Sequence, residues 1–185
     1  MEIEVKAKVA DLISLRGALE ELGCTFFAPV VQDDTVFVRT VGTIEEYLCN
    51  SVFLRVRIQN DGTVLLTAKK ATTQSAENLV KTEYEVVVNS ADEVCSLLEL
   101  AGFQRSVHVR KTRQKSHYGA YEICLDDIDG LGSFIELEQI AEEHAAENIQ
   151  REMFAFLGSL GISPEDQVKK GYDILMLEKQ LKSEV

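Results

Sequence analysis

The feature that most constrains this chain is a charge at every second residue of its extended segments. At the N-terminus, Glu2, Glu4, Lys6 and Lys8 alternate with aliphatic residues. Successive side chains of a β-strand point to opposite faces, so this segment predicts a strand with one charged and one aliphatic face. Such a strand must belong to a sheet whose aliphatic face is covered by other elements.

The same alternation recurs along the chain. The charged or polar residues that share a strand face are Arg55 and Arg57, Thr67 and Lys69, Glu83 and Glu85, Lys111 with Arg113 and Lys115, Glu122 with Asp126, and Glu136 with Glu138. Strand character is also seen over 31–40, 52–58, 64–70, 107–116 and 119–126, and Asn60-Asp61-Gly62 is a hairpin turn signal. We therefore expect about eight strands.

Helices are predicted between the strands. One follows Asp11 and ends at Gly23, and a second begins at Ser90 and ends at Gly102. Others are expected over about 143–160 and 172–181. The 185 residues show no strict strand–helix alternation and no linker, which predicts a single α+β domain over 1–185, with an antiparallel sheet that closes into a barrel.

Two interpretations of the charged faces are open. They are either the solvated side of an ordinary antiparallel sheet, or the lining of a barrel whose aliphatic outer side is covered by helices. A solvated face usually mixes Thr, Ser, Gln and Lys, whereas here Glu-x-Glu, Arg-x-Arg and Lys-x-Arg recur. Charges of both signs in a partly desolvated interior would offset one another's burial cost.

A charged lining of this kind has an expected ligand. Converging lysine and arginine side chains neutralise phosphate oxygens, while carboxylates hold Mg²⁺ or Mn²⁺, which bridges to phosphates. The residue types alone therefore indicate a triphosphate or another short polyphosphate, together with Mg²⁺ or Mn²⁺.

Composition limits the other partners. The formal net charge of −12 and the pI near 4.7 argue against nucleic acid or an anionic membrane surface as the main partner. The four scattered cysteines form no zinc-type ligand set, and no signal peptide or spanning segment is evident. We expect a soluble, cytoplasmic protein with reduced thiols; whether it is a homodimer is left open.

In their order along the chain, these motifs resemble the CYTH family, the triphosphate tunnel metalloenzymes, which includes class IV adenylate cyclases and triphosphatases. The matching motifs are Glu2-x-Glu4-x-Lys6, Leu54-Arg55-Val56-Arg57, Thr67-Ala68-Lys69, Lys111-Thr112-Arg113, Leu125-Asp126 and the block from Gly130 to Glu138. The segment from Gln32 to Phe37 resembles the family's Q-x-D-x-Y-F, with Val36 where an aromatic residue is usual.

The resemblance implies a closed eight-stranded antiparallel tunnel with a polar, charged interior and helices packed on the outside. It implies a metal site at Glu2, Glu4, Glu136 and Glu138. It implies phosphate binding by Lys6, Arg55, Arg57, Lys69, Lys111 and Arg113. Glu83, Glu85, Glu122 and Asp126 would be further acidic tunnel residues, either functional or paired with the basic set, while Lys8 and Lys115 are expected at strand ends in solvent.

Two reactions fit such a tunnel, and in either one Lys69 or Asp126 is a candidate for handling a proton. In a cyclase, the ribose hydroxyl of ATP attacks the α-phosphorus, giving cyclic AMP and pyrophosphate. In a triphosphatase, water attacks the terminal phosphorus of tripolyphosphate, thiamine triphosphate or a nucleoside triphosphate. Length and the C-terminal helices resemble the cyclase branch most, a triphosphatase is the alternative, and a non-catalytic sensor of nucleotide or polyphosphate is the third hypothesis.

Overall fold

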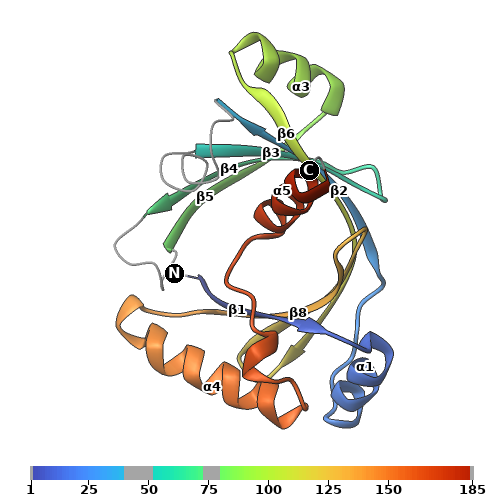
Figure 1. Cartoon of the computed structure of the whole chain (residues 1–185), viewed down its shortest axis with the longest axis vertical. Coiled ribbons are helices and arrows are strands. Elements are labelled where there is room, and N and C mark those ends of the chain that lie inside the picture. Colours follow the sequence, from blue (N-terminus) through green and yellow to red (C-terminus); the bar gives the residue numbers. More distant parts are fainter. Residues whose placement is uncertain (1, 40–51, 73–79, 184–185) are drawn as a thin grey trace. The chain divides into compact units, whose positions relative to one another are not determined.

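A computed structural model describes residues 2–39, 52–72 and 80–183 of the chain. The strands are β1 (Glu2–Val9), β2 (Val30–Val38), β3 (Val52–Gln59), β4 (Val64–Thr72), β5 (Val80–Val88), β6 (Gln104–Tyr118), β7 (Tyr121–Ile128) and β8 (Gly132–Ile140). The helices are α1 (Leu12–Glu21), α3 (Ala91–Leu100), α4 (Ala146–Ser159) and α5 (Tyr172–Ser183), with 3-10 turns η1 (Glu143–Ala145) and η2 (Pro164–Asp166). The described part of the chain is therefore α+β, as the alternation predicts (Figure 1).

The eight strands form one sheet in the order β1-β8-β7-β6-β2-β3-β4-β5. Neighbours pair antiparallel, as β1 does with β8 and β3 does with β4. The turn after β3 contains Gly62 at φ +87°, a left-handed conformation that suits the hairpin signal in the sequence. Within the residues described, β1 and β5 are the two end strands of this order and no ladder joins them, so the closure of the barrel stays a prediction.

The chain forms two compact units: unit 1 contains residues 1–30 and 111–170, and unit 2 contains residues 31–110 and 171–185. In unit 1, the aliphatic faces of β1, β7 and β8 pack with α1 and α4 in one hydrophobic cluster, which includes Val5, Leu19, Leu137 and Met153. Asp11 caps α1 by accepting hydrogen bonds from the backbone N–H groups of Ile13 and Ser14. The helices of unit 1 thus cover the uncharged side of their strands, as expected.

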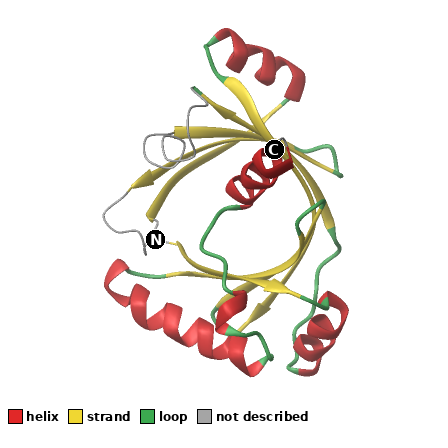
Figure 2. Ribbon diagram, viewed as in Figure 1, coloured by secondary structure: helices red, strands yellow, loops and turns green. Residues whose placement is uncertain are grey.

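Unit 2 has helices on both sides of its strands (Figure 2). On the aliphatic side, α3 packs with Phe37 and Val56 through Cys95 and Leu98. On the other side, Leu177 of α5 is buried with the valines of β2 and β6 at 36, 38 and 107. The register places Val36 opposite Arg55, so α5 lies on the charged face.

The prediction that all helices pack outside the charged faces is therefore wrong for α5. The charged face of unit 2 is polar only over part of its area, and α5 covers the apolar remainder, including Val36. Because Val36 is 2% exposed, it is buried by the protein's own helix. No helix within the described residues is long and apolar enough to cross a membrane.

Candidate functional site

In unit 1, the predicted metal and phosphate residues share one face of β1, β8, β7 and β6. Strand register decides this arrangement, because directly opposite residues point to the same side of a sheet. Glu4 lies opposite Glu138 and Lys6 opposite Glu136, and Glu138 lies opposite Glu122 on β7. The structure therefore brings together nine of the predicted residues in this unit: Glu2, Glu4, Lys6, Lys111, Arg113, Glu122, Asp126, Glu136 and Glu138.

Glu136 is the most strongly neutralised carboxylate of this face. Its Oε1 lies 2.9 Å from Nζ of Lys6, and its Oε2 accepts a hydrogen bond from Nη2 of Arg113. Although burial alone would raise it, Lys6 and Arg113 hold the pKa of Glu136 well below its ordinary value. Conversely, against the effect of burial, Glu136 and Glu4 raise the pKa of Lys6.

Glu4, Glu138 and Glu122 lie abreast on three adjacent strands, and we call them the acidic row. Neighbouring strands are about 4.8 Å apart, so like charges in such a row repel one another. Burial, reinforced by Glu136, Glu2 and Glu4 and opposed by Arg113, raises the pKa of Glu138 to about 7. A carboxyl group that is costly to ionise in this setting is the kind of ligand that a divalent cation would stabilise, so the residues fit the predicted metal.

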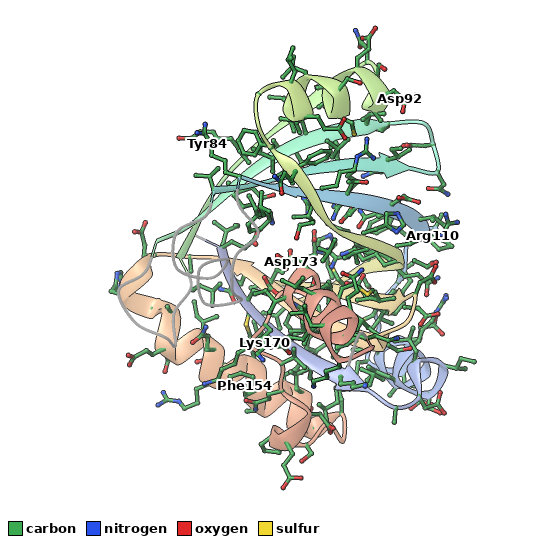
Figure 3. All side chains as sticks on the ribbon, turned by 45° about the horizontal axis from the view of Figure 1, so that its top comes forward. Tyr84, Asp92, Arg110, Phe154, Lys170 and Asp173 are labelled. Carbon is green, nitrogen blue, oxygen red and sulfur yellow. The ribbon has the colours of Figure 1, made fainter. Side chains whose placement is uncertain are left out.

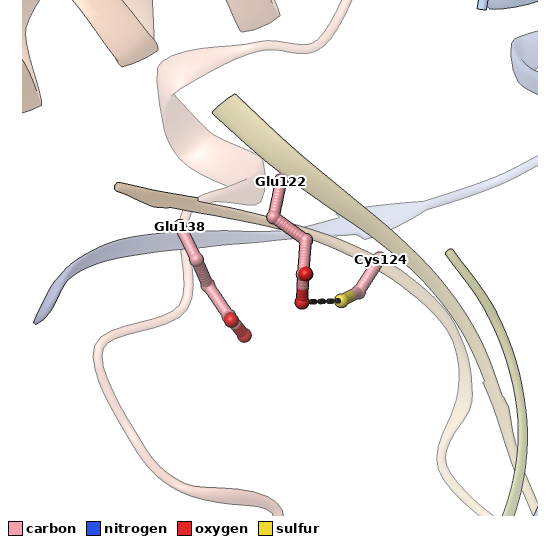
Figure 4. Close-up of side chains that lie close together, drawn as sticks. All are labelled: Glu122, Cys124 and Glu138. Carbon is pink, nitrogen blue, oxygen red and sulfur yellow. Dashed lines mark hydrogen bonds between the residues drawn. The ribbon is translucent and has the colours of Figure 1, made fainter. Parts of the chain in front are cut away.

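A thiol adjoins the acidic row. One ligand atom each of Glu122, Cys124 and Glu138 lie within 4.8 Å of one another (Figure 4). From the sequence, Cys124 is expected to be an ordinary reduced thiol, whereas in the structure it lies on the charged face, opposite Glu136. Cys124 lies two residues from both Glu122 and Asp126 on the same strand, so its side chain points to their face. That spacing is visible in the sequence, but cysteine was grouped there with the apolar residues.

Lys115 departs from its expected position. It is not at a strand end, because β6 continues to Tyr118, and its Nζ lies 2.5 Å from Oε1 of Glu122. Burial lowers and the hydrogen bond to Glu122 raises the pKa of Lys115, with a net rise. The prediction that Lys115 lies at a strand end is therefore wrong, although its side chain is 44% exposed. Each member of the acidic row has a cation nearby, since Nζ of Lys6 lies 2.9 Å from Oε1 of Glu4 and Nη1 of Arg113 lies 3.8 Å from Oε1 of Glu138.

Arg113 and Asp126 form a buried fork. The Nε of Arg113 donates to Oδ1 of Asp126 at 2.7 Å and its Nη2 donates to Oδ2 at 2.5 Å. Nζ of Lys111 lies 3.5 Å from the same Oδ2. Asp126 is 0% exposed; it accepts hydrogen bonds from Arg113 and forms an ion pair with Lys111. The carboxylate of Asp126 therefore fixes the positions of Lys111 and Arg113, two of the residues predicted to bind phosphate.

In unit 2, the predicted residues Arg55, Arg57, Lys69, Glu83 and Glu85 share one face of β3, β4 and β5. The Nη2 of Arg55 lies 3.5 Å from Glu83 and 3.3 Å from Glu85. Nζ of Lys69 lies 2.5 Å from Oε2 of Glu83. Burial, together with the charge of Arg57, lowers the pKa of Arg55. The glutamates of β5 are therefore partners of the basic residues, one of the two roles that were open.

Asp34 is a further member of this face that sequence reasoning did not assign. It lies opposite Arg57 in the β2–β3 register and accepts two hydrogen bonds from it. Two consecutive aspartates, Asp33 and Asp34, point to opposite faces of the strand. The Q-x-D-x-Y-F resemblance places its aspartate at Asp34, but no role was predicted for that residue. Asp34 lies two residues before Val36, so the two side chains share the strand face that is opposite Arg55 and Arg57.

Residues 1–172 match the CYTH domain family. The chain belongs to the CYTH domain family. A protein of Methanocaldococcus jannaschii with the name "Putative adenylate cyclase" is 28% identical over 175 residues, covering 93% of this chain and 96% of that protein.

Solved structures show the same fold. A protein of Pyrococcus horikoshii superposes with a TM-score of 0.81 at 26% identity, covering 97% of this chain and 99% of that one. A "Putative adenylyl cyclase" of Hippeastrum, described as having a dominant triphosphatase activity, gives a TM-score of 0.66 at 17% identity, covering 97% and 96%. At that identity the likeness to the Hippeastrum protein concerns the fold alone.

Proposed function

We propose that this CYTH protein is a metal-dependent enzyme that acts on a triphosphate. The observation that carries the proposal is the acidic row beside a set of buried cations on the same strand faces. An ordinary solvated face leaves its charges in water, whereas Lys6 and Lys111, in the same unit as the acidic row, are each less than 10% exposed. Ordered cations and mutually repelling carboxylates suit a polyanion accompanied by a divalent metal.

The metal set is proposed to be Glu2, Glu4, Glu136 and Glu138, with Mg²⁺ or Mn²⁺ as the ion. Among these, Glu138 is the best supported, because its pKa is raised to about 7, whereas Glu136 already contacts two cations. When bound, the metal would supply charge neutralisation between phosphate oxygens.

The protein's own cations are proposed to bind and orient the phosphates. They are Lys6, Arg55, Arg57, Lys69, Lys111 and Arg113. Positioning and electrostatic stabilisation are most of what phosphoryl transfer requires from a protein. Both candidates for proton handling are paired, Lys69 with Glu83 and Asp126 with Arg113 and Lys111. Lys69 is the more accessible, because its side chain is 18% exposed and that of Asp126 is 0% exposed.

We propose the cyclase reaction first, in which ATP gives cyclic AMP and pyrophosphate. It is supported by the name of the M. jannaschii relative, which aligns with 93% of the chain. The alternative is a triphosphatase, and it is supported by the activity described for the Hippeastrum protein of the same fold. We further propose that the whole chain works as one tunnel domain with its eight strands closed into a barrel.

Product identification tests the proposal. Purified protein with Mn²⁺ or Mg²⁺ and ATP, resolved by ion-exchange chromatography, should yield cyclic AMP and pyrophosphate. ADP with phosphate, or cleavage of added tripolyphosphate, would establish the triphosphatase instead. Binding of both compounds without turnover would leave only a sensor and overturn the enzyme proposal.

The metal assignment has its own test. Glu138→Gln should lower metal-dependent turnover by about 100-fold or more, the scale expected when one preorganised electrostatic group is lost. Glu147→Gln is the matched control, because Glu147 is exposed on α4, and it should retain full activity. Unchanged turnover in Glu138→Gln would remove Glu138 from the metal site.

A further inference from the structure

Arg57 is held by a two-point fork. Its Nε donates to Oδ1 of Asp34 at 2.7 Å, and its Nη2 donates to Oδ2 at 2.7 Å. Asp34 is 5% exposed and Arg57 is 8% exposed, so water competes little for either group. A bidentate contact fixes the plane of the guanidinium as well as its position.

Arg55, two residues away on the same face, is held differently. Within the described residues, Arg55 donates hydrogen bonds through Nη2 alone, to Thr67 at 3.1 Å and to Glu85 at 3.3 Å. The Nε of Arg55 is buried and has no hydrogen-bond partner among those residues. A single donor atom leaves the guanidinium plane able to rotate. The fork is therefore specific to Arg57 and is not a general result of crowding on β3.

The same fork occurs in unit 1. Arg113 uses Nε and Nη2 on the two oxygens of Asp126, and these two residues are also directly opposite on adjacent strands. The third nitrogen of Arg57, Nη1, takes no part in its fork. In unit 1 the surroundings differ, because Nη2 of Arg113 also donates to Glu136 and its Nη1 lies 3.8 Å from Oε1 of Glu138. The recurrence on two strand pairs shows that a bidentate aspartate contact holds an arginine in each unit.

Stability alone explains such a fork poorly. A buried ion pair often contributes no more to folding than apolar residues of similar volume would. We propose that Asp34 is a positioning residue that orients Arg57 so that its Nη1 edge is presented to a phosphate of the substrate. The inference rests on the proposed function, and it adds to it a residue that acts through Arg57 and does not touch the substrate.

Asp33 provides a matched control on the same strand. It faces the opposite side of the sheet, where His108 lies 2.5 Å and Arg110 lies 3.4 Å from its carboxylate oxygens. Arg110 is exposed at the surface of the molecule (Figure 3). Asp33→Asn thus makes the same chemical change one residue away, in a surface ion pair.

The experiment measures tripolyphosphate affinity by calorimetry, and KM and kcat with the active substrate, for Asp34→Asn, Arg57→Ala, the double variant and Asp33→Asn. Asp34→Asn should weaken binding or kcat/KM by roughly 10- to 100-fold, as expected for a misaligned group. Asp33→Asn should stay within about twofold of the wild type, as for surface changes. The double variant should be no worse than Arg57→Ala, because both changes remove one interaction.

The outcomes separate cleanly. Multiplicative losses in the double variant, or normal binding in Asp34→Asn, would overturn the positioning role while leaving the proposed function intact. If Asp34→Asn fails to fold, Asp34→Glu keeps the charge: partial retention of affinity supports the role, and wild-type affinity with a displaced carboxylate contradicts it. A wild-type protein that neither binds nor turns over ATP or tripolyphosphate with metal present would refute the proposed function, and this inference with it.

Discussion

At the scale of single residues, Glu136 and Glu138 look alike in sequence but differ in surroundings. Both lie on one strand face, yet Glu136 contacts Lys6 and Arg113 closely, whereas Glu138 lies between Glu4 and Glu122 with Arg113 3.8 Å away. Alternation predicted their common face. It could not predict the difference, because cross-strand partners depend on register, and register is set by pairing between strands far apart in the sequence.

Because their surroundings differ, substitutions of Glu136 and of Glu138 should change the free energy of unfolding in opposite directions. Glu136→Gln should lower the free energy of unfolding by about 3–5 kcal/mol, the cost of leaving a buried charge without its partner. Chemical denaturation at neutral pH would measure it, with Glu147→Gln on exposed α4 as the reference. A loss below about 1 kcal/mol, typical of an exposed ion pair, would show that Lys6 and Arg113 are solvated instead.

The raised pKa of Glu138 predicts a pH dependence of stability. Since the folded pKa, about 7, lies above the ordinary value of 4.5, the folded protein binds this proton more tightly than the unfolded chain does. Without metal, stability should therefore fall as pH rises from about 4.5 to about 7, by at most about 3 kcal/mol from this group.

The control for this prediction is Glu138→Gln, which lacks the titration. Thermal unfolding of both proteins without metal should give similar stabilities near pH 4.5 and a more stable variant near pH 8. Added Mn²⁺ should stabilise the wild type more than the variant at the higher pH. Parallel pH profiles of the two proteins would contradict the assignment.

At the scale of whole elements, the sequence predicted the strands well and the side on which α5 packs poorly. The apolar residues of α5 show that one of its faces is buried, but they do not tell which side of the sheet receives it. The valines of β2 at positions 36 and 38 interrupt the charged face and leave an apolar area. The sequence alone does not show this interruption, because it depends on the register that pairs β2 with β3 and places Val36 opposite Arg55.

Leu177 should therefore be the main anchor of α5. Leu177→Ala should lower the free energy of unfolding by about 2–4 kcal/mol, because it leaves a cavity against the valine cluster. Leu181 on the same helix is 44% exposed, so Leu181→Ala is the matched control and should cost less than about 1 kcal/mol. Equal effects in denaturant titrations would mean that α5 does not pack in this way.

At the scale of the whole molecule, the net charge of −12 and the binding of a polyanion have to be reconciled. Six of the basic residues are gathered on the charged strand faces, while acidic residues such as Glu147 and Glu152 are exposed on α4. The composition could predict the overall repulsion of anions. It could not predict that these basic side chains gather on the strand faces, because that depends on the alignment of strands distant in sequence.

This charge distribution predicts the effect of salt on association. The acidic exterior should slow the approach of tripolyphosphate, and salt screens that repulsion over about 10 Å at 0.1 M. The association rate constant in stopped-flow experiments should rise several-fold between about 10 and 150 mM salt, while Arg57→Ala mainly raises the dissociation rate. A rate constant that falls with salt would show that the local cations dominate the approach.

Cys124 can serve as a chemical probe of the charged face, because its thiol lies beside Glu122 and Glu138. The thiol is fully buried, and burial, partly opposed by Arg113, raises its pKa, so an alkylating reagent can reach it only when the face opens. Cys24 and Cys95 lie in the aliphatic clusters and supply internal references. Mass spectrometry of the peptides that contain these cysteines would give their relative alkylation rates, and hence how often the interior of unit 1 is exposed. A metal ion bound at the acidic row should slow the alkylation of Cys124 selectively.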